Sequence, residues 1–498
     1  MTATGHHAGR GMTAPGPAAG SPGPLRPAAP RHRPLAAVEL ARLHEAALEA
    51  LATRGVALAG ETARALFTAA GATIEPASGR LLLPAELVRA AVAQAPSSFV
   101  LPGRVPERDV TIGGGPGGLM AATAAAPDVA AAALLADALP EVAVIGLPAR
   151  RLAELPAAVE ASAKPVLVCG ALSAAQAAVV IAAAAALGGR HGGDEGDADR
   201  SAADSATTDR SAAGRAASDR AATARPPIGV VVHSTQQVDI DPLLACARAG
   251  LVCGFFVAPL LGGERPADRS EALIAVHAAA LAACAAAQLA APGAPYVVPA
   301  LASAIEDHAP GFGLGPAGVA TFTQLAQLAA HTGLPIAAGF PPTRPAADEW
   351  LAAADGTLVA LAAALAGASL LAVAGHTDDA GVYSPAQLVL DAETWSNVAA
   401  VAAGITVDDE TLALDTIAAV GIGGNALAQK HTRRHMKDVW KPRLFDRTAF
   451  DTWEREGRRS APQRAAVLAG ELIAGHEVPP LDGEKAATLR RIMQEAGL

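Results

Sequence analysis

Acidic and imidazole side chains gather at two places in the second half of the chain. Glu306, Asp307 and His308 form one cluster, and His376 begins the other, in the run His-Thr-Asp-Asp. Such groups can attract a cation, exchange protons or ligate a metal. The spacing matches no specific metal motif, and a histidine–aspartate pair without an identifiable nucleophile is weak evidence for a hydrolase. Glu306, Asp307 and His376 are therefore the candidate catalytic residues, as the polar wall of a binding site.

These clusters follow short apolar runs that have the character of parallel strands. Each run precedes a helical stretch, and this alternation predicts βαβ units. The runs lie near residues 116–122, 142–146, 166–170, 228–233, 252–257, 295–300, 334–339 and 369–374. A count of eight favours a closed α/β TIM barrel over an open doubly wound sheet. Catalytic groups of such barrels lie where the strands end, which is where Asp307 and His376 stand.

The rest of the sequence divides around this barrel. Residues 1–34 are rich in Gly, Pro and Ala, and we expect a disordered tail without a signal peptide. Residues 35–114 predict a helical region with a short hairpin, and residues 115–404 the barrel. Within the barrel, 190–225 is low in large apolar groups and reads as a disordered insertion. Residues 405–498 predict a C-terminal helical region.

Bulk composition excludes some classes of protein. The net charge of −10 argues against a nucleic-acid partner. The alanine-rich stretch near 275–292 reads as a buried helix rather than a membrane span. Four cysteines are widely spaced, without metal-binding spacing, and indicate buried thiols in a reducing cytoplasm. These are Cys169, Cys246, Cys253 and Cys284.

A basic segment follows the predicted barrel. His431 and His435 are four residues apart on a predicted helix and share one face, beside Arg433, Arg434 and Lys437. Without a third ligand, a solvated or capping role is favoured over zinc. The basic face either contacts an acidic partner or is solvated.

The C-terminal third carries a run that resembles a known family. Trp440-Lys441-Pro442-Arg443-Leu444-Phe445-Asp446-Arg447, ahead of Phe450 and Trp453, is similar to the C-terminal signature of the trimethylamine methyltransferase (MttB) family. Further segments in the same order extend the resemblance over most of residues 36–490. They include Gly103-Arg104, Leu135 to Pro140, Lys164-Pro165-Val166 and Gln387 to Glu393.

The resemblance implies a chemistry as well as a fold. It implies a TIM barrel with added helices that moves a methyl group from a methylated amine to a corrinoid (cobalamin). A corrinoid-binding partner protein carries that cofactor, and this chain binds none tightly. The cobalt nucleophile performs the difficult step, so the enzyme positions the substrate and favours its charge distribution. This role needs no catalytic triad.

One departure narrows the expected substrate. The trimethylamine branch of the family carries pyrrolysine, and this sequence has none. Members without it look like enzymes for quaternary amines such as glycine betaine. A quaternary ammonium site uses aromatic faces, and Phe256, Trp350 and Tyr383 are the candidate substrate-binding residues near the barrel mouth.

Two alternatives stay open. The loop after the seventh strand, residues 339–345, carries three prolines, and Glu306 stands where the family usually has methionine. These changes motivate a barrel-fold binding protein for methylated amines that has lost methyl transfer. The second alternative is a metal-dependent barrel hydrolase that uses His233, Asp307 and His376. The sequence leaves a homo-oligomer possible.

Overall fold

The computed structural model describes most of the chain between its N-terminal segment and Leu498. The described residues are 33–188, 226–234, 239–257, 260–261, 269–300, 303–304, 316–339, 349–377 and 382–498. The expected tail, except for its last residues, and the expected insertion at 190–225 lie outside this set.

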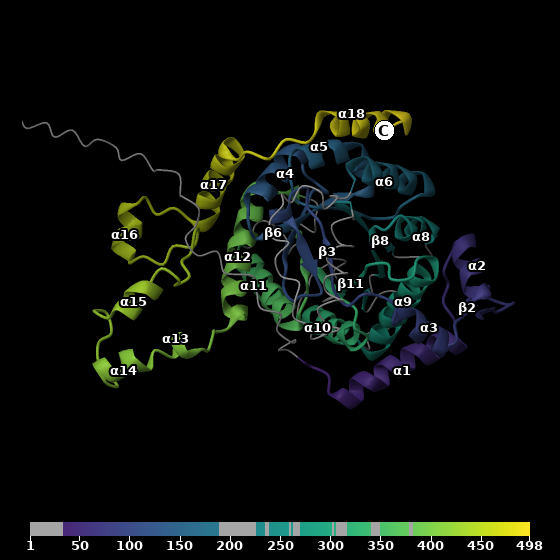
Figure 1. Cartoon of the computed structure of the whole chain (residues 1–498), viewed down its shortest axis with the longest axis horizontal. Helices are drawn as coiled ribbons and strands as arrows, with labels where there is room; N and C mark the ends of the chain where they lie inside the picture. Colours follow the sequence, from purple (N-terminus) through teal and green to yellow (C-terminus); the bar gives the residue numbers. More distant parts are fainter. Residues whose placement is uncertain are drawn as a thin grey trace, which may run out of the picture.

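Eight parallel strands close into a barrel, which confirms the predicted fold class (Figure 1). Around the barrel the order is β11, β13, β14, β5, β6, β7, β8 and β9, with β9 paired back to β11. The strands are β5 (Gly118–Ala122), β6 (Val142–Pro148), β7 (Val166–Cys169), β8 (Ile228–Ser234), β9 (Val252–Val257), β11 (Tyr296–Ala300), β13 (Ile336–Gly339) and β14 (Leu370–Ala374). Their near-continuous apolar sequences follow from burial on both faces.

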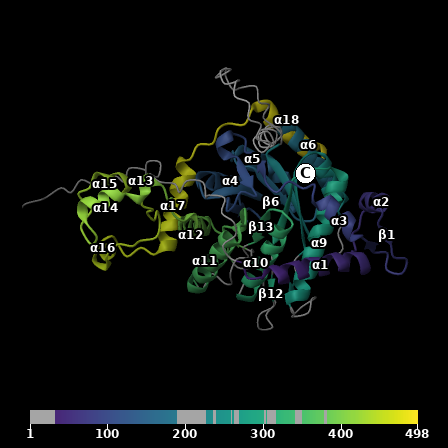
Figure 2. The same cartoon turned by 60° about the horizontal axis from the view of Figure 1, so that its bottom comes forward.

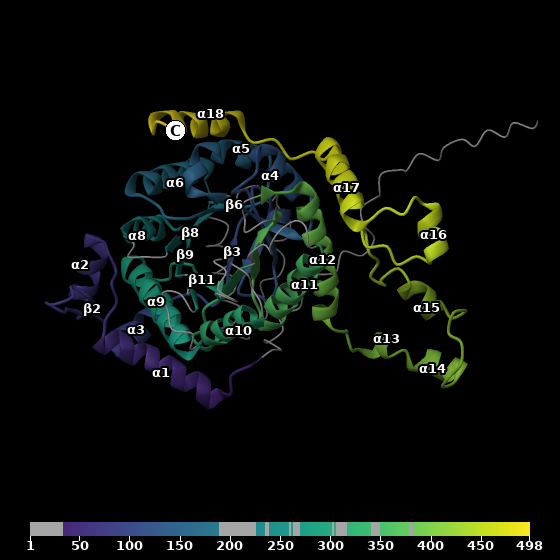
Figure 3. The ribbon, with the colours of Figure 1, turned by 180° about the vertical axis from the view of Figure 1, so that it is seen from behind.

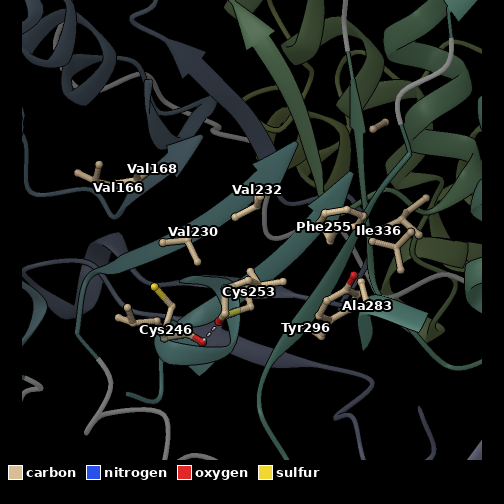
Figure 4. Packing of buried hydrophobic residues seen from close by; sticks show 14 of the residues in the cluster. Val166, Val168, Val230, Val232, Cys246, Cys253, Phe255, Ala283, Tyr296 and Ile336 are labelled. Atoms are coloured by element: carbon tan, nitrogen blue, oxygen red, sulfur yellow. Dashed lines mark hydrogen bonds between the residues drawn. The ribbon is translucent and has the colours of Figure 1, made fainter. Parts of the chain in front are cut away.

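A ring of helices covers the outside of the barrel. It consists of α4 (Val129–Ala138), α5 (Leu155–Glu160), α6 (Ala174–Leu187), α8 (Asp241–Arg248), α9 (Arg269–Ala290), α10 (Pro316–His331), α11 (Glu349–Ala366) and α12 (Pro385–Ala403). Alternate strand residues face these helices, as Val166 and Val168 of β7 and Val230 and Val232 of β8 do (Figure 4). The many alanines on the helices allow close approach to the strands.

The helix α9 is long and apolar enough to cross a membrane, judged by length and composition alone, and 78% of the relevant window is buried inside the protein. It packs against α1 (Ala37–Thr53), α2 (Glu61–Ala69) and α3 (Ala85–Val92), the purple helices of Figure 1. The short pair β1 (Thr73–Ile74) and β2 (Leu81–Leu82) joins α2 to α3. The predicted buried helix is thus confirmed.

All four cysteines are free. Cys246, Cys253 and Cys284 are buried, and Cys253 Sγ lies 3.7 Å from the Leu243 carbonyl (Figure 4). Burial raises the pKa of Cys246 and of the partly exposed Cys169 to about 12. The thiols therefore stay protonated near neutral pH and behave as packing groups.

An antiparallel hairpin closes one end of the barrel. Its strands are β3 (Phe99–Leu101) and β4 (Val110–Ile112), and β3 lies inside the ring of strands in Figure 1. The hairpin side chains pack with one residue from each of five barrel strands, namely Val144, Leu167, Val252, Val297 and Leu370. These lie near the starts of their strands. The hairpin therefore fills the N-terminal end of the barrel, and the C-terminal end is left for chemistry.

The chain after the barrel leaves it and then returns. The segment with α13 (Asp409–Leu412), α14 (Leu414–Val420), α15 (Lys430–His435) and α16 (Phe450–Arg455) extends away from the barrel in Figures 2 and 3. The last two helices, α17 (Ala461–Gly475) and α18 (Gly483–Glu495), pack back onto the outer ring.

Glu393 of α12 anchors the run from Trp440 to Arg447. Its buried carboxylate accepts the backbone N–H groups of Arg443 at 3.0 Å and Phe445 at 3.3 Å. Trp440 Nε1 donates to Ser396 Oγ at 3.1 Å, and the Arg447 guanidinium lies 5.7 Å from the Trp440 ring centre. The run that resembles a family signature thus fixes the returning chain to the barrel.

Candidate active site

Of the loops at the C-terminal rim, the described ones directly follow β14, β5, β6 and β7. After β14, the chain makes a second small hairpin, β15 (His376–Thr377) with β16 (Val382–Tyr383), in which His376 pairs with Tyr383. Two of the predicted site residues, His376 and Tyr383, are therefore neighbours in the structure. We call this hairpin and its two rings the His–Tyr hairpin.

His376 lies under the rim with only 2% of its surface exposed. Its Nε2 accepts the N–H of Ala125, at 3.4 Å, from the loop after β5. Its Nδ1 has no partner of good hydrogen-bond geometry within the described part of the chain. Burial lowers the pKa of His376; a weak hydrogen bond to the backbone carbonyl of Ala374 opposes this effect, and the charge of Arg150 adds to it. The ring is therefore neutral near pH 7, with its proton assigned to Nδ1 because Nε2 accepts.

Tyr383 completes this pair. Its ring meets the His376 ring edge to face, with ring centres 5.8 Å apart and planes at 69°. Its hydroxyl is buried and has no partner among the described residues. Burial raises the pKa of Tyr383 well above its ordinary value, so the phenol keeps its proton. Two buried donors without a well-aligned acceptor among the described residues thus stand on one hairpin, although nearly all buried polar groups in proteins are paired.

Asp391 of α12 holds the His–Tyr hairpin in place. Its carboxylate accepts Gly375 N–H at 2.8 Å and Gln387 Nε2 at 2.7 Å. Burial raises the pKa of Asp391 to about 6, although both hydrogen bonds oppose the shift. Gly375 has φ of 91°, and a Cβ there would lie 3.1 Å from Tyr383 Cε2. Only glycine fits this turn and leaves the tyrosine ring room to pack.

Two arginines hold the neighbouring loop, which follows β5. They belong to the 3₁₀ turn Ala149–Glu154 that follows β6. Arg151 donates to the carbonyls of Thr123 at 2.8 Å and Ala126 at 2.6 Å, and it pairs with Glu154 at 2.7 Å. Arg150 donates to the Ala124 carbonyl at 3.1 Å. The loop that donates to His376 is therefore rigidly placed.

The remaining predicted residues are spread along the rim or lie beyond the described part. Phe256 pairs with His233 in the β8–β9 ladder, but its side chain is outside the described set. Glu306 and Asp307 also fall outside that set. Trp350, at the start of α11, is 85% exposed and forms no cage in the described structure. Their binding roles stay predictions.

The two histidines of α15 are engaged outside the rim. His431 Nε2 lies 3.0 Å from the Glu410 carbonyl, and His435 Nδ1 lies 2.9 Å from Asp438 Oδ2. Within the described ranges, no three His, Cys, Asp or Glu side chains converge as metal ligands.

Sequence reasoning missed Arg150, Arg151 and Asp391. Nothing in their local spacing marks them, although Asp391 lies in a segment that carries the family resemblance. The one signal in the sequence was the helix start at Ser384, which places Asp391 about two turns into the helix.

Comparison with known proteins places this arrangement in a family. A sequence profile described as Trimethylamine methyltransferase (MTTB) matches residues 4–496. The trimethylamine methyltransferase MttB of Desulfitobacterium hafniense (strain DSM 10664 / DCB-2) is 26% identical over 483 residues, 92% of this chain and 92% of that protein. The glycine betaine methyltransferase of Desulfitobacterium hafniense (strain Y51) is 29% identical over 261 residues, 52% of this chain and 54% of that protein.

Among solved structures, the Methanosarcina barkeri monomethylamine methyltransferase (MtmB) is similar, with a TM-score of 0.49 and 12% identity. The match covers 93% of this chain and 88% of that chain. The profile match includes the barrel, the His–Tyr hairpin and the run from Trp440 to Arg447, and it confirms the predicted resemblance. The chain therefore belongs to the trimethylamine methyltransferase (MttB) family of methyltransferases.

Proposed function

We propose that this protein transfers a methyl group from a small quaternary or methylated amine to a corrinoid carried by a partner protein. Membership of the family supports methyl transfer, and its trimethylamine and glycine betaine methyltransferase relatives support these two amines as the kinds of donor. The amine binds at the C-terminal rim, beside the His–Tyr hairpin.

The observation that carries this site is the pair of unsatisfied buried donors. His376 Nδ1 and Tyr383 Oη have no well-aligned partner among the described residues, whereas an unpaired buried polar group costs about 1–3 kcal/mol. A ligand that accepts hydrogen bonds would satisfy both groups. The opposite end of the barrel is filled by the β3–β4 hairpin, so the ligand and the corrinoid both approach from the rim.

The protonation states fit a quaternary donor. When a methyl group leaves a quaternary ammonium, the departing tertiary amine keeps its electron pair and needs no proton. A rim with a neutral imidazole and a neutral phenol can serve this reaction without acid catalysis. A reduced corrinoid, when a partner presents it, supplies the nucleophile for the methyl carbon.

The chain's own groups then bind and orient the substrate. His376 and Tyr383 donate to an acceptor at one end of the amine, such as a carboxylate. Phe256, Tyr383 and Trp350 are the aromatic residues that would contact its cationic end, and Glu306 and Asp307 would add electrostatic attraction. A fixed orientation places the methyl group toward the open rim.

A matched pair of substrates tests this function. Glycine betaine and tetramethylammonium carry the same fixed charge, but only glycine betaine has an acceptor. With cob(I)alamin as methyl acceptor, the wild-type protein should demethylate glycine betaine, as followed by corrinoid absorbance and by mass spectrometry of the amine. Tyr383→Phe should lower kcat/KM for glycine betaine about tenfold, the value of one lost hydrogen bond, and leave the tetramethylammonium rate unchanged.

The same experiment separates the alternatives. Calorimetric binding of betaine without methyl transfer to cob(I)alamin would identify the binding protein. Asp307→Ala should weaken betaine binding, and unchanged turnover would remove that residue from the site. Because the Tyr383 hydroxyl has no partner among the described residues, Tyr383→Phe should unfold at the same or a higher denaturant concentration, so a loss of activity cannot be assigned to misfolding.

A further inference from the structure

The segment between α12 and α17 has almost no core of its own. We call residues 405–459, with α13 to α16, the arm. Its single buried residue is Leu444, at its base. The helices of the arm have 4, 7, 6 and 6 residues. Isolated helices of this length are marginal in water, because most helical stability in proteins comes from packing. The arm therefore needs a surface that a single copy of the chain does not provide.

The arm also exposes apolar side chains out of proportion to its length. Ten of the nineteen exposed large apolar side chains in the described residues lie on it, each at least 46% exposed, and Ile422 is fully exposed. They are Ile405, Val407, Leu412, Leu414, Ile417, Ile422, Leu427, Met436, Val439 and Phe450. Apolar exposure concentrated in one segment in this way is typical of protein interfaces.

Charge is divided along the arm into two blocks of opposite sign. Residues 405–429 hold the acids Asp408, Asp409, Glu410 and Asp415 and no Lys, Arg or His. Residues 430–443 hold six Lys or Arg residues and one acid, Asp438. Within one copy the blocks already attract each other, since Glu410 pairs with Arg434 and lies 3.4 Å from His435 Nε2. A surface that carries both complementary blocks is complementary to itself under a two-fold axis.

The position of the arm argues against the corrinoid protein as its partner. The arm begins where α12 ends, and α12 runs from the C-terminal rim toward the N-terminal end of the barrel. At its base, Arg443 pairs at 3.1 Å with Glu141, directly before β6 begins. The arm is therefore rooted at the plugged end, opposite the rim where, under the proposed function, the corrinoid protein must dock and leave.

A second copy of this chain is a partner that is always present at the same concentration. We propose that the arm is the interface between two copies of this chain, with the acidic α13–α14 block of one copy against the basic α15 block of the other. Stable interfaces use roughly 20–30 residues a side. The 55-residue arm, with its ten apolar groups, supplies more than that.

Light scattering after size exclusion tests the assembly with the full chain. We expect an oligomer at micromolar concentration, and the double variant Leu414→Glu with Ile422→Glu should elute as a monomer. Val38→Glu, which changes an equally exposed apolar residue on α1, should remain oligomeric. A monomeric wild-type protein, or an assembly that survives the double variant, would overturn the proposal.

Zero-length cross-linking identifies the occupant of the arm. In an equal mixture of ¹⁴N and ¹⁵N protein, links between a lysine of 430–441 and an acid of 408–415 should carry both labels. Links carrying one label only, or links from these lysines to the rim, would contradict the arrangement. Methyl transfer plays no part in either readout, so this proposal and the proposed function can fail separately.

Discussion

Two clusters of buried polar groups, one at each end of the barrel, differ in how completely they are paired. At the N-terminal end, Asp137 is buried and its carboxylate meets four partners. They are Ala163 N–H at 2.8 Å, Ser162 Oγ at 2.9 Å, Arg108 at 3.1 Å and His476 Nε2 at 2.8 Å. At the C-terminal rim, His376 and Tyr383 each keep a buried polar atom without a well-aligned partner in the described structure.

Lys164 extends the paired network at the N-terminal end. Its buried ammonium donates to the carbonyls of Ala136 at 2.5 Å and Leu139 at 2.6 Å, which end helix α4. Burial lowers the pKa of Lys164 to about 7. Burial alone would raise the pKa of Asp137, but the bond from His476 and the charges of Arg108 and Lys164 bring it below its ordinary value.

We infer from this difference that the paired network around Asp137 serves stability, whereas His376 and Tyr383 serve ligand binding. A fully satisfied buried network rigidifies a fold, whereas a partly satisfied one is costly unless a ligand completes it. In this barrel the satisfied network lies beside the plugged end, and the pair His376 and Tyr383 lies at the C-terminal rim. The division matches the general rule that barrel enzymes keep chemistry at the C-terminal face and stability at the other.

The largest expected effect comes from breaking the satisfied end. Asp137→Ala leaves Arg108 and Lys164 without their counter-charge and removes four hydrogen bonds. Removing one partner of a buried ion pair costs about 3–5 kcal/mol, and urea unfolding should show a loss of that size. Binding of glycine betaine, measured below the unfolding transition, should not change. A stability loss under about 1 kcal/mol would mean that the Asp137 network does not stabilise the N-terminal end of the barrel.

A smaller effect is expected where the rim is built. Gly375→Ala forces a positive φ on a residue with a Cβ, which costs about 1–2 kcal/mol, and places that Cβ against Tyr383. Gly71→Ala is the matched control, because Gly71 has φ of 100° and no atom lies within 4 Å of the position that a Cβ would take. Gly375→Ala should lose at least as much stability as Gly71→Ala in urea unfolding, because only its Cβ meets neighbouring atoms. Only Gly375→Ala should weaken betaine binding, and equal binding by the two variants would separate the hairpin from the site.

Ligand affinity at the C-terminal rim and stability at the N-terminal end should change in different pH ranges. The pKa of His376 is below its ordinary 6.5, so the affinity for tetramethylammonium, which has no carboxylate to pair with a charged ring, should be constant above pH 6.5. It should fall only below that pH, because the charged ring repels the cation. The pKa of Asp137 is below its ordinary 3.8, so its contribution to stability is complete above pH 3.8 and is lost as the pH falls through its folded value.

Calorimetry and circular dichroism between pH 6.5 and pH 3.8 check whether affinity is lost before the protein unfolds. Affinity should decline in a range where the fold persists, and His376→Gln should remove the decline. Loss of affinity in step with unfolding would show that the two ends do not titrate separately.

The sequence predicted the barrel well because periodicity and strand–helix alternation are local signals. The eight apolar runs, such as the one before His376, coincide with the eight barrel strands. The hairpin that fills the barrel was predicted only as a hairpin. Its packing against Val144, Val252 and Leu370 depends on contacts between segments far apart in the chain, which no local pattern records.

The candidate site was predicted in part, for a related reason. His376 and Tyr383 were chosen as strand-end residues, and the structure brings them together. The segments that carry the family resemblance proved to be mainly structural: Asp137, Lys164 and Glu393 pair buried groups away from the rim. The resemblance to the family therefore lies mainly in residues that stabilise the fold. The proximity of the candidate site residues His376 and Tyr383 became visible only in the structure.

The smallest expected effect concerns Trp350, which belongs to the rim but is 85% exposed. Trp350→Ala should change the free energy of unfolding by less than about 0.5 kcal/mol, as exposed substitutions do. If its ring covers the bound cation, the variant should bind glycine betaine a few-fold more weakly, since a cation–π contact at an exposed site contributes about 0.5–1 kcal/mol. Leu358→Ala, also exposed and on the same helix, is the control and should bind normally. Equal affinities in calorimetry would restrict the recognition of the cation to groups nearer the His–Tyr hairpin, and would sharpen the contrast between a small buried site and the exposed rim around it.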